Sequence, residues 1–177
     1  MAYSFTEARI GLPAIANIDA GISTANQTTA IPTPPATLGM VCRAFDPTFG
    51  EGEFILLAGV ASTIVGSLVV YDGVTYTTTL AAVTANQARP VAVAMSANAA
   101  STTFGWYQIS GTAVVAKSAV AIAAKVAIGV NSTGKVGATA SGKEIENCRT
   151  ANTATVASAT TTLRITIDRP HLQGRVT

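Results

Sequence analysis

Charged side chains are scarce in this sequence: only 11% of its 177 residues are Asp, Glu, Lys or Arg, against about a quarter in a typical soluble domain. The 11 basic and 9 acidic residues leave a net charge of +2. Nucleic-acid binding needs a clustered basic surface, and the lysines and arginines here are scattered among neutral residues. We therefore expect no nucleic-acid partner. So little charge also predicts that other protein copies or partners cover much of the surface.

Long apolar runs are also lacking, although the mean hydropathy is +0.42. The longest runs, 54–61 and 119–130, fall short of the roughly 18 to 20 residues that a membrane-spanning helix needs. Glu7 and Arg9 interrupt the start of the chain, where a signal peptide would need an apolar run. We expect no membrane partner, and synthesis in the cytoplasm without secretion.

Residues that carry out chemistry are few, with one histidine and two cysteines. His171 follows Arg169-Pro170 near the C-terminus, where we expect it to be exposed or at an interface rather than held in a catalytic pocket. Cys42 and Cys148 have no CxxC spacing, so we expect two buried thiols rather than a disulfide or zinc ligands. We assign no catalytic residue, no metal ligand and no cofactor, and we expect a protein that is not an enzyme.

Two patterns come close to known sites. Residues 137–144 approach the phosphate-binding loop G-x-x-x-x-G-K-[ST], but Glu144 replaces the hydroxyl that would hold Mg²⁺, and strand-like sequence follows instead of a helix. A turn with surface charge is the better interpretation. The pairs Glu51/Glu53 and Glu144/Glu146 have the spacing of two that places carboxylates on one side of a strand. Chance explains them equally well, and residues 50–53 are typical of an exposed turn.

Small and β-branched residues dominate instead: the sequence has 33 Ala, 26 Thr and 17 Val, a composition that favours strands over helices. The runs 67–71 and 74–79 flank Asp72-Gly73, a dipeptide that predicts a hairpin with a type I′ turn. The run 163–168 alternates apolar and polar residues, and Arg169-Pro170 should end it. Residues 131–134 resemble the loop of another hairpin.

Four further segments are expected to be strands, namely 91–95, 104–110, 112–116 and 125–130. Alanine-rich 113–127 could instead form a helix, but its β-branched residues argue for strands. Seven or more short strands predict an all-β fold, either a small β-barrel or a β-sandwich.

Residues 1–37 differ from the rest, and we expect an extended N-terminal arm followed by a β-rich domain at 38–177. The arm has three charges, and its sequence 31–35, Ile-Pro-Thr-Pro-Pro, must be extended. Its apolar content is too high for a disordered tail. It either covers its own domain's core or binds another polypeptide. The candidate partner-binding residues are Tyr3, Phe5, Ile10, Leu12, Ile15, Ile18 and Ile31.

A resemblance to a known family emerges from residues 59–63, 66–72, 90–95, 107–111 and 113–115. In order and composition these segments resemble the small β-rich decoration, or cement, proteins of tailed-phage capsids. The resemblance covers roughly residues 38–172. It implies a structural virion protein on the outer capsid surface, made in the host cytoplasm, that clamps subunits of the major capsid protein. It also implies copies that assemble with one another, as trimers rather than dimers, and it assigns no contact residues.

Other functions remain open at this stage. A tail or head-fibre component would also be β-rich and oligomeric. A carbohydrate-binding adhesive module would need an exposed aromatic platform, for which Trp106 and Tyr107 are the candidates. Strand alternation places these two side chains on opposite faces, so at least one should belong to the core.

Overall fold

The computed structural model describes residues 3–6, 12–19 and 34–174, and within these ranges the chain forms strands and no helix. The prediction of an all-β fold is confirmed. Ten strands form one sheet and two strands form a second sheet, and strand pairing does not close either into a barrel.

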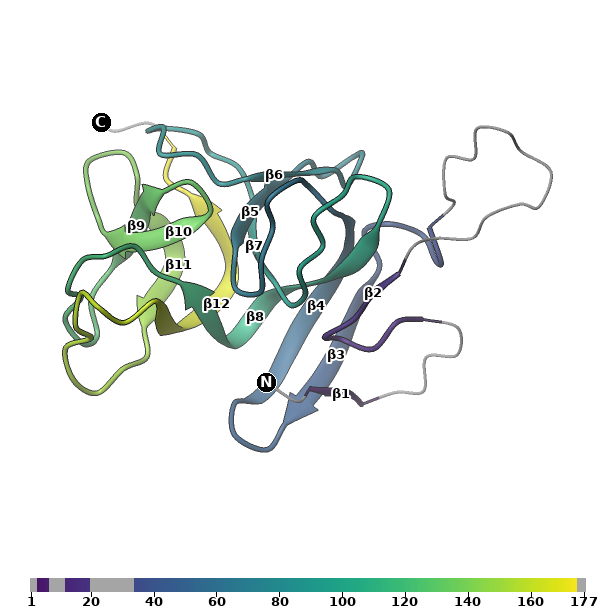
Figure 1. The fold of residues 1–177 in the computed structure, drawn as a ribbon, viewed down its shortest axis with the longest axis horizontal. Coiled ribbons are helices and arrows are strands. Elements are labelled where there is room, and N and C mark those ends of the chain that lie inside the picture. The colour runs from purple at the N-terminus through teal and green to yellow at the C-terminus, as the bar shows by residue number, and fades with distance from the viewer. Residues whose placement is uncertain (1–2, 7–11, 20–33, 175–177) are drawn as a thin grey trace.

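The strands follow one another along the whole described chain. They are β1 (Ser4–Phe5), β2 (Ile18–Asp19), β3 (Val41–Asp46), β4 (Gly50–Ala58), β5 (Leu68–Tyr71), β6 (Thr78–Leu80), β7 (Val91–Ala94), β8 (Phe104–Ala116), β9 (Ile128–Ser132), β10 (Lys135–Ala138), β11 (Ile145–Thr150) and β12 (Thr162–Leu172). Figure 1 shows β1–β4 on one side of the molecule and β9–β12 on the other, with β8 between them.

Strand β8 connects the two sides because it changes partners along its length. Its first half pairs with β4, from Ala58↔Phe104 to Glu53↔Ser110. Its second half pairs with β12, from Ser110 to Ala116. The change occurs at Gly111, whose φ of +97° bends the strand. The two strands expected at 104–110 and 112–116 are therefore one strand with a bend.

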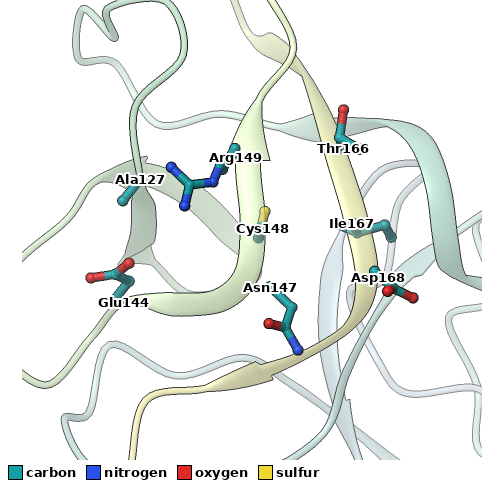
Figure 2. Close-up of a pocket in the computed structure, with 8 residues that line it drawn as sticks. All are labelled: Ala127, Glu144, Asn147, Cys148, Arg149, Thr166, Ile167 and Asp168. Carbon is teal, nitrogen blue, oxygen red and sulfur yellow. The ribbon is translucent and has the colours of Figure 1, made fainter.

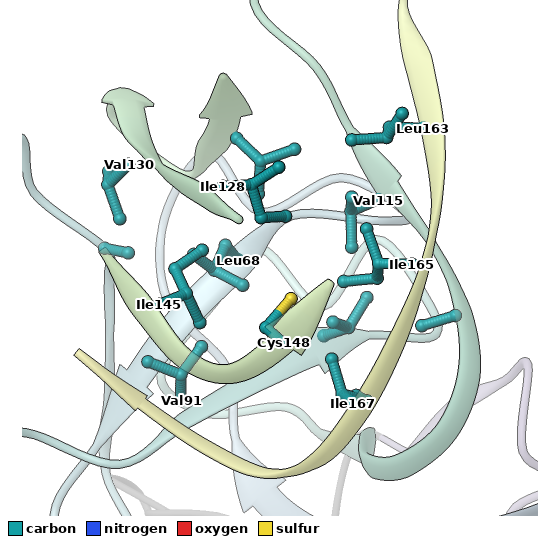
Figure 3. Close-up of a cluster of buried hydrophobic side chains, with 14 of the residues drawn as sticks. Leu68, Val91, Val115, Ile128, Val130, Ile145, Cys148, Leu163, Ile165 and Ile167 are labelled. Carbon is teal, nitrogen blue, oxygen red and sulfur yellow. The ribbon is translucent and has the colours of Figure 1, made fainter. Parts of the chain in front are cut away.

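A large apolar cluster, the C-terminal core, lies beneath β12 (Figure 3). It collects Leu163, Ile165 and Ile167, the alternate residues of β12 that the sequence predicted to share a buried face. Side chains of β5, β7, β8, β9, β10 and β11, together with Ala81 and Ile122, complete it. The alternation of apolar and polar residues over 163–168 thus correctly predicted a strand with one face in the core and the other in solvent.

Two further clusters lie on opposite faces of the sheet around β4 and β8. One, here called the arm-covered cluster, contains Phe54, Leu56 and Trp106, each with no exposed surface. The other contains Ile55, Leu57 and Tyr107. Because successive side chains of a strand point to opposite faces, the continuous apolar sequence of β4 supplies both clusters.

Both described parts of the predicted arm join this sheet. Strand β1 pairs with β3 through Ser4↔Phe45 and Phe5↔Ala44, and β2 pairs with the start of β8. Each ladder contains two residue pairs. The described residues before Pro34 therefore lie on the domain of their own chain.

The first predicted hairpin is present, but its turn differs from the prediction. Strands β5 and β6 pair from Tyr71↔Thr78 to Val69↔Leu80, so residues 72–77 form a six-residue loop rather than a two-residue turn. The Asp72 carboxylate accepts hydrogen bonds from the backbone N–H groups of Val74 (2.9 Å) and Thr75 (2.7 Å). This local capping stabilises the longer loop in place of the type I′ turn.

The prediction that Arg169-Pro170 ends its strand is wrong. Strand β12 continues to Leu172, with Arg169 at φ +46° and a shift in register opposite Asn147, which has φ +56°. Proline is tolerated at such a bulge because the ladder is already interrupted there. Beyond the bulge, an isolated bridge joins His171 to Pro90.

Two other local predictions also need correction. The strand expected at 125–130 begins only at Ile128, since Lys125 adopts φ +56° in a turn. Residues 50–53, expected to be an exposed turn, begin β4. The hairpin around 131–134 is confirmed, with Gly134 at φ +68° between β9 and β10. The charged turn expected within 137–144 is also present, at Ser141–Gly142.

Candidate functional site

The residues predicted to bind a partner pack within their own chain where the structure describes them. Ile15 is 1% exposed and Tyr3 is 8% exposed, and both belong to the arm-covered cluster. Phe5 and Leu12 are partly buried against it. Ile10 and Ile31 lie outside the described residues, and Ile18 is described only through the backbone of β2.

Specific polar contacts hold these arm residues in place. The Trp106 indole N–H donates to the Pro13 carbonyl at 2.9 Å. The Tyr3 hydroxyl donates to the Thr112 carbonyl at 2.9 Å and accepts a longer hydrogen bond, 3.4 Å, from the Gln108 amide. The Tyr3 ring meets Phe54 edge-on, with 4.8 Å between centroids. Hydrogen bonds to buried donors restrict where the segment can lie, which apolar contact alone does not.

Neither aromatic residue considered for sugar binding is exposed. Trp106 and Tyr107 both have 0% exposed surface and lie in clusters on opposite faces of the sheet. Burial raises the pKa of Tyr107 to about 12, although its contacts with Asn98 and Thr78 oppose that shift. The two rings are therefore core residues and offer no surface on which a sugar could stack.

The two cysteines and the histidine lie apart. Cys42 belongs to the arm-covered cluster and Cys148 to the C-terminal core, and no disulfide joins them, as predicted. His171 lies on β12 rather than in a terminal tail, and its Nε2 is 2.6 Å from Oε2 of Glu146 on β11. Within the described ranges, no three potential ligands among His, Cys, Asp and Glu come close enough to hold a metal ion.

A shallow pocket of about 320 Å³ lies between β11 and β12 (Figure 2). Its polar side chains include Glu144, Asn147, Arg149 and Asp168, which point in different directions instead of converging on one point. The buried Cys148 thiol lies at its base, and burial raises the pKa of that thiol to about 12. A thiol that stays protonated at neutral pH is a poor nucleophile, so this pocket does not resemble a cysteine active site.

Several of the few charges form ion pairs between the β3–β4 hairpin and β12 or within the hairpin itself. Glu53 contacts Arg169 at 2.9 Å and Arg43 at 3.3 Å, and Arg43 also lies 3.9 Å from Glu51. The two arginine side chains are 65% and 66% exposed. Exposed pairs of this kind contribute at most about 1 kcal/mol each to stability. Glu51 and Glu53, the two glutamates considered as an acid–base pair, thus both form ion pairs with arginine.

The three most exposed large apolar side chains lie in two loops, one on each side of β5 in the chain. Loop 59–66 carries Ile64 (52% exposed) and Val65 (57%), and loop 72–77 carries Val74 (85%). Other residues of these loops, 59–61 and 77, line a groove of about 480 Å³ together with residues 99–101, and Ile64, Val65 and Val74 are not among its lining residues. Its lining is mostly alanine, glycine, valine and threonine. We call loops 59–66 and 72–77 together the apolar loops.

The apolar loops were not predicted from the sequence as a binding surface. A signal was present, because Ile64-Val65 stands inside the stretch 59–67, which is otherwise rich in Gly, Ser and Thr. Turn-forming residues keep such a segment at the surface, and apolar side chains within it then have no core to enter.

No helix in the described part of the chain is long and apolar enough to cross a bilayer. Comparison with protein-family models, curated proteins and solved structures gave no match to this chain.

Proposed function

We propose that this chain is a structural virion protein, a decoration protein that binds the outer surface of a tailed-phage head and stabilises contacts between subunits of the major capsid protein. The observation that carries the proposal is the pair of apolar loops. Their three most exposed apolar side chains, Ile64, Val65 and Val74, gain from leaving water only when another surface covers them.

The charge distribution supports binding by burial rather than by electrostatic attraction. The net charge is +2, and Glu53 of the β3–β4 hairpin pairs within the chain with Arg43 of the hairpin and Arg169 of β12. Apolar contact provides roughly 25 cal/mol per Å² of apolar surface removed from water. A standard interface of about 1,600 Å² can then hold a decoration protein on a shell after the cost of association.

The test is binding of the purified chain to phage heads from which it is absent. The expected result is a chain that sediments with heads, raises their rupture temperature and is found by gold labelling over the shell. A variant with Ile64→Asp, Val65→Asp and Val74→Asp should bind at least about tenfold more weakly, because charges would be buried without partners.

A matched control keeps the added charge and moves it to another part of the molecule. Thr153, Thr155 and Thr160 are exposed in the loop that follows β11, and their replacement by Asp adds the same three charges. This control should bind heads as the unaltered chain does. Gold labelling confined to tails or fibres, or equal binding by both triple variants, would contradict the proposal.

A further inference from the structure

We propose that the arm-covered cluster is a strand-exchange site between copies of this chain. In an associated pair, the described arm residues 3–6 and 12–19 of one copy, here called the segment, occupy the face of the second copy that they occupy here on their own domain. The inference comes from intrachain packing and does not depend on a role in phage heads.

The segment has the contacts of a separable element. It joins the sheet through two ladders of two residue pairs each, one to β3 and one to the start of β8. Apart from a backbone hydrogen bond from Thr6 to Arg43, most remaining contacts are made by side chains on a surface formed by β3, β4 and β8. Ile15 is fully buried there, and the Phe5 ring centroid lies 5.6 Å from that of Trp106. Such contacts are the same whichever copy supplies the segment.

The receiving face needs this cover. Without the segment, Phe54, Leu56 and Trp106 would lose apolar cover, and the Trp106 N–H would lose its acceptor at Pro13. The Tyr3 hydroxyl also provides a partner for the Gln108 amide. If its own segment were absent, this apolar face would therefore bind the same segment of another copy.

The chain between the segment and the domain is long enough for exchange. Fourteen residues, 20–33, separate Asp19 from Pro34, and fourteen residues can span up to roughly 46 Å. A domain of this size is about 35 to 40 Å across, as estimated from its expected radius of gyration. The tether can therefore reach a neighbouring copy.

The β1–β3 ladder provides the test. Ser4 lies directly opposite Phe45, and both side chains are exposed. The variants Ser4→Cys and Phe45→Cys are co-expressed as separate full-length chains, one of them tagged, and then oxidised. Exchange predicts a disulfide-linked heterodimer, at least about tenfold more abundant than from the control pair Ser4→Cys with Thr153→Cys. Mass spectrometry of the joined peptides identifies the bond.

A chain carrying both Ser4→Cys and Phe45→Cys shows whether the geometry permits the bond. If this double variant closes only on itself and the separate variants yield no heterodimer above the control, the inference is overturned. If the double variant forms no bond at all, Thr6→Cys with Arg43→Cys replaces the pair, because the Thr6 N–H donates to the Arg43 carbonyl at 3.2 Å. Either outcome leaves the head-binding test unaffected.

Discussion

Trp106 links the first residues of the chain to the middle of the sheet. Its ring has no exposed surface, it meets Phe5 edge-on, and its indole N–H donates to Pro13. A buried indole N–H without an acceptor would cost about 1 to 3 kcal/mol. One side chain of β8 therefore fixes the position of two parts of the arm.

The contribution of the arm to stability can be measured at Ile15. Replacing this fully buried residue with alanine should lower the free energy of unfolding by about 2 to 5 kcal/mol, because buried apolar contacts are lost and a cavity remains. Urea unfolding followed by tryptophan fluorescence measures the change. Val74→Ala, at a side chain that is 85% exposed, is the control and should change stability by less than about 0.5 kcal/mol. Equal effects would show that Ile15 is not packed as described.

The Cys148 thiol should make the free energy of unfolding depend on pH in the alkaline range. Burial raises the pKa of its thiol from the ordinary value of 9.0 to about 12. The folded state therefore holds a proton that the unfolded state releases, so the free energy of unfolding should fall as pH rises from about 9 towards 12. The slope is at most about 1.4 kcal/mol per pH unit for one group.

The variant Cys148→Ala removes that titration while Tyr107, whose pKa is also raised to about 12, remains. Between pH 9 and 10 the free energy of unfolding of this variant should therefore decline less steeply than that of the unaltered chain. Identical slopes in urea titrations across this range would contradict the assigned burial of the thiol.

At the scale of elements, Gly111 determines the path of β8. Its φ is +97°, and a Cβ there would lie 2.5 Å from the Glu51 carbonyl oxygen. Gly111→Ala should therefore lower the free energy of unfolding by about 2 to 3 kcal/mol through backbone strain alone. Gly73→Ala is a matched control, because a Cβ at Gly73 would meet no atom within 4 Å. Thermal unfolding should show little change for that control, and a comparable loss in both variants would contradict the assigned role of the bend.

Periodic elements could be predicted from the sequence, whereas their interruptions could not. The alternation of Leu163, Ile165 and Ile167 correctly indicated a half-buried strand. The end of that strand was mispredicted because proline ends a strand only where its backbone N–H would have to donate to the neighbouring strand. At the bulge opposite Asn147 the ladder is already interrupted, so Pro170 does not have to donate a hydrogen bond there. Bulges depend on the partner strand, which the local sequence does not reveal.

The candidate surfaces were predictable to a similar extent. The apolar content of the first 37 residues indicated that they must lie against something, and Tyr3 and Ile15 are indeed buried. The local pattern could not identify the surface, because the acceptors and donors that fix the arm, at Thr112 and Gln108, are more than one hundred residues away.

On the scale of the whole molecule, the scarcity of charge has a measurable consequence. With 11% charged residues and a net charge of +2, association should be driven by apolar burial, which salt does not screen. Raising NaCl from about 0.1 M to about 1 M should therefore leave self-association unchanged or strengthen it. Sedimentation equilibrium measures the effect, and dissociation at high salt would show that ion pairs hold the copies together.

Strand β8 also has a mechanical consequence. Its first half belongs to the ladder with β4 and its second half to the ladder with β12, so a single run of covalent backbone passes through both ends of the molecule. A tensile force applied to one end would be carried to the other along this strand and would load both ladders lengthwise, in shear. The shared strand would therefore make the two ladders carry the same load.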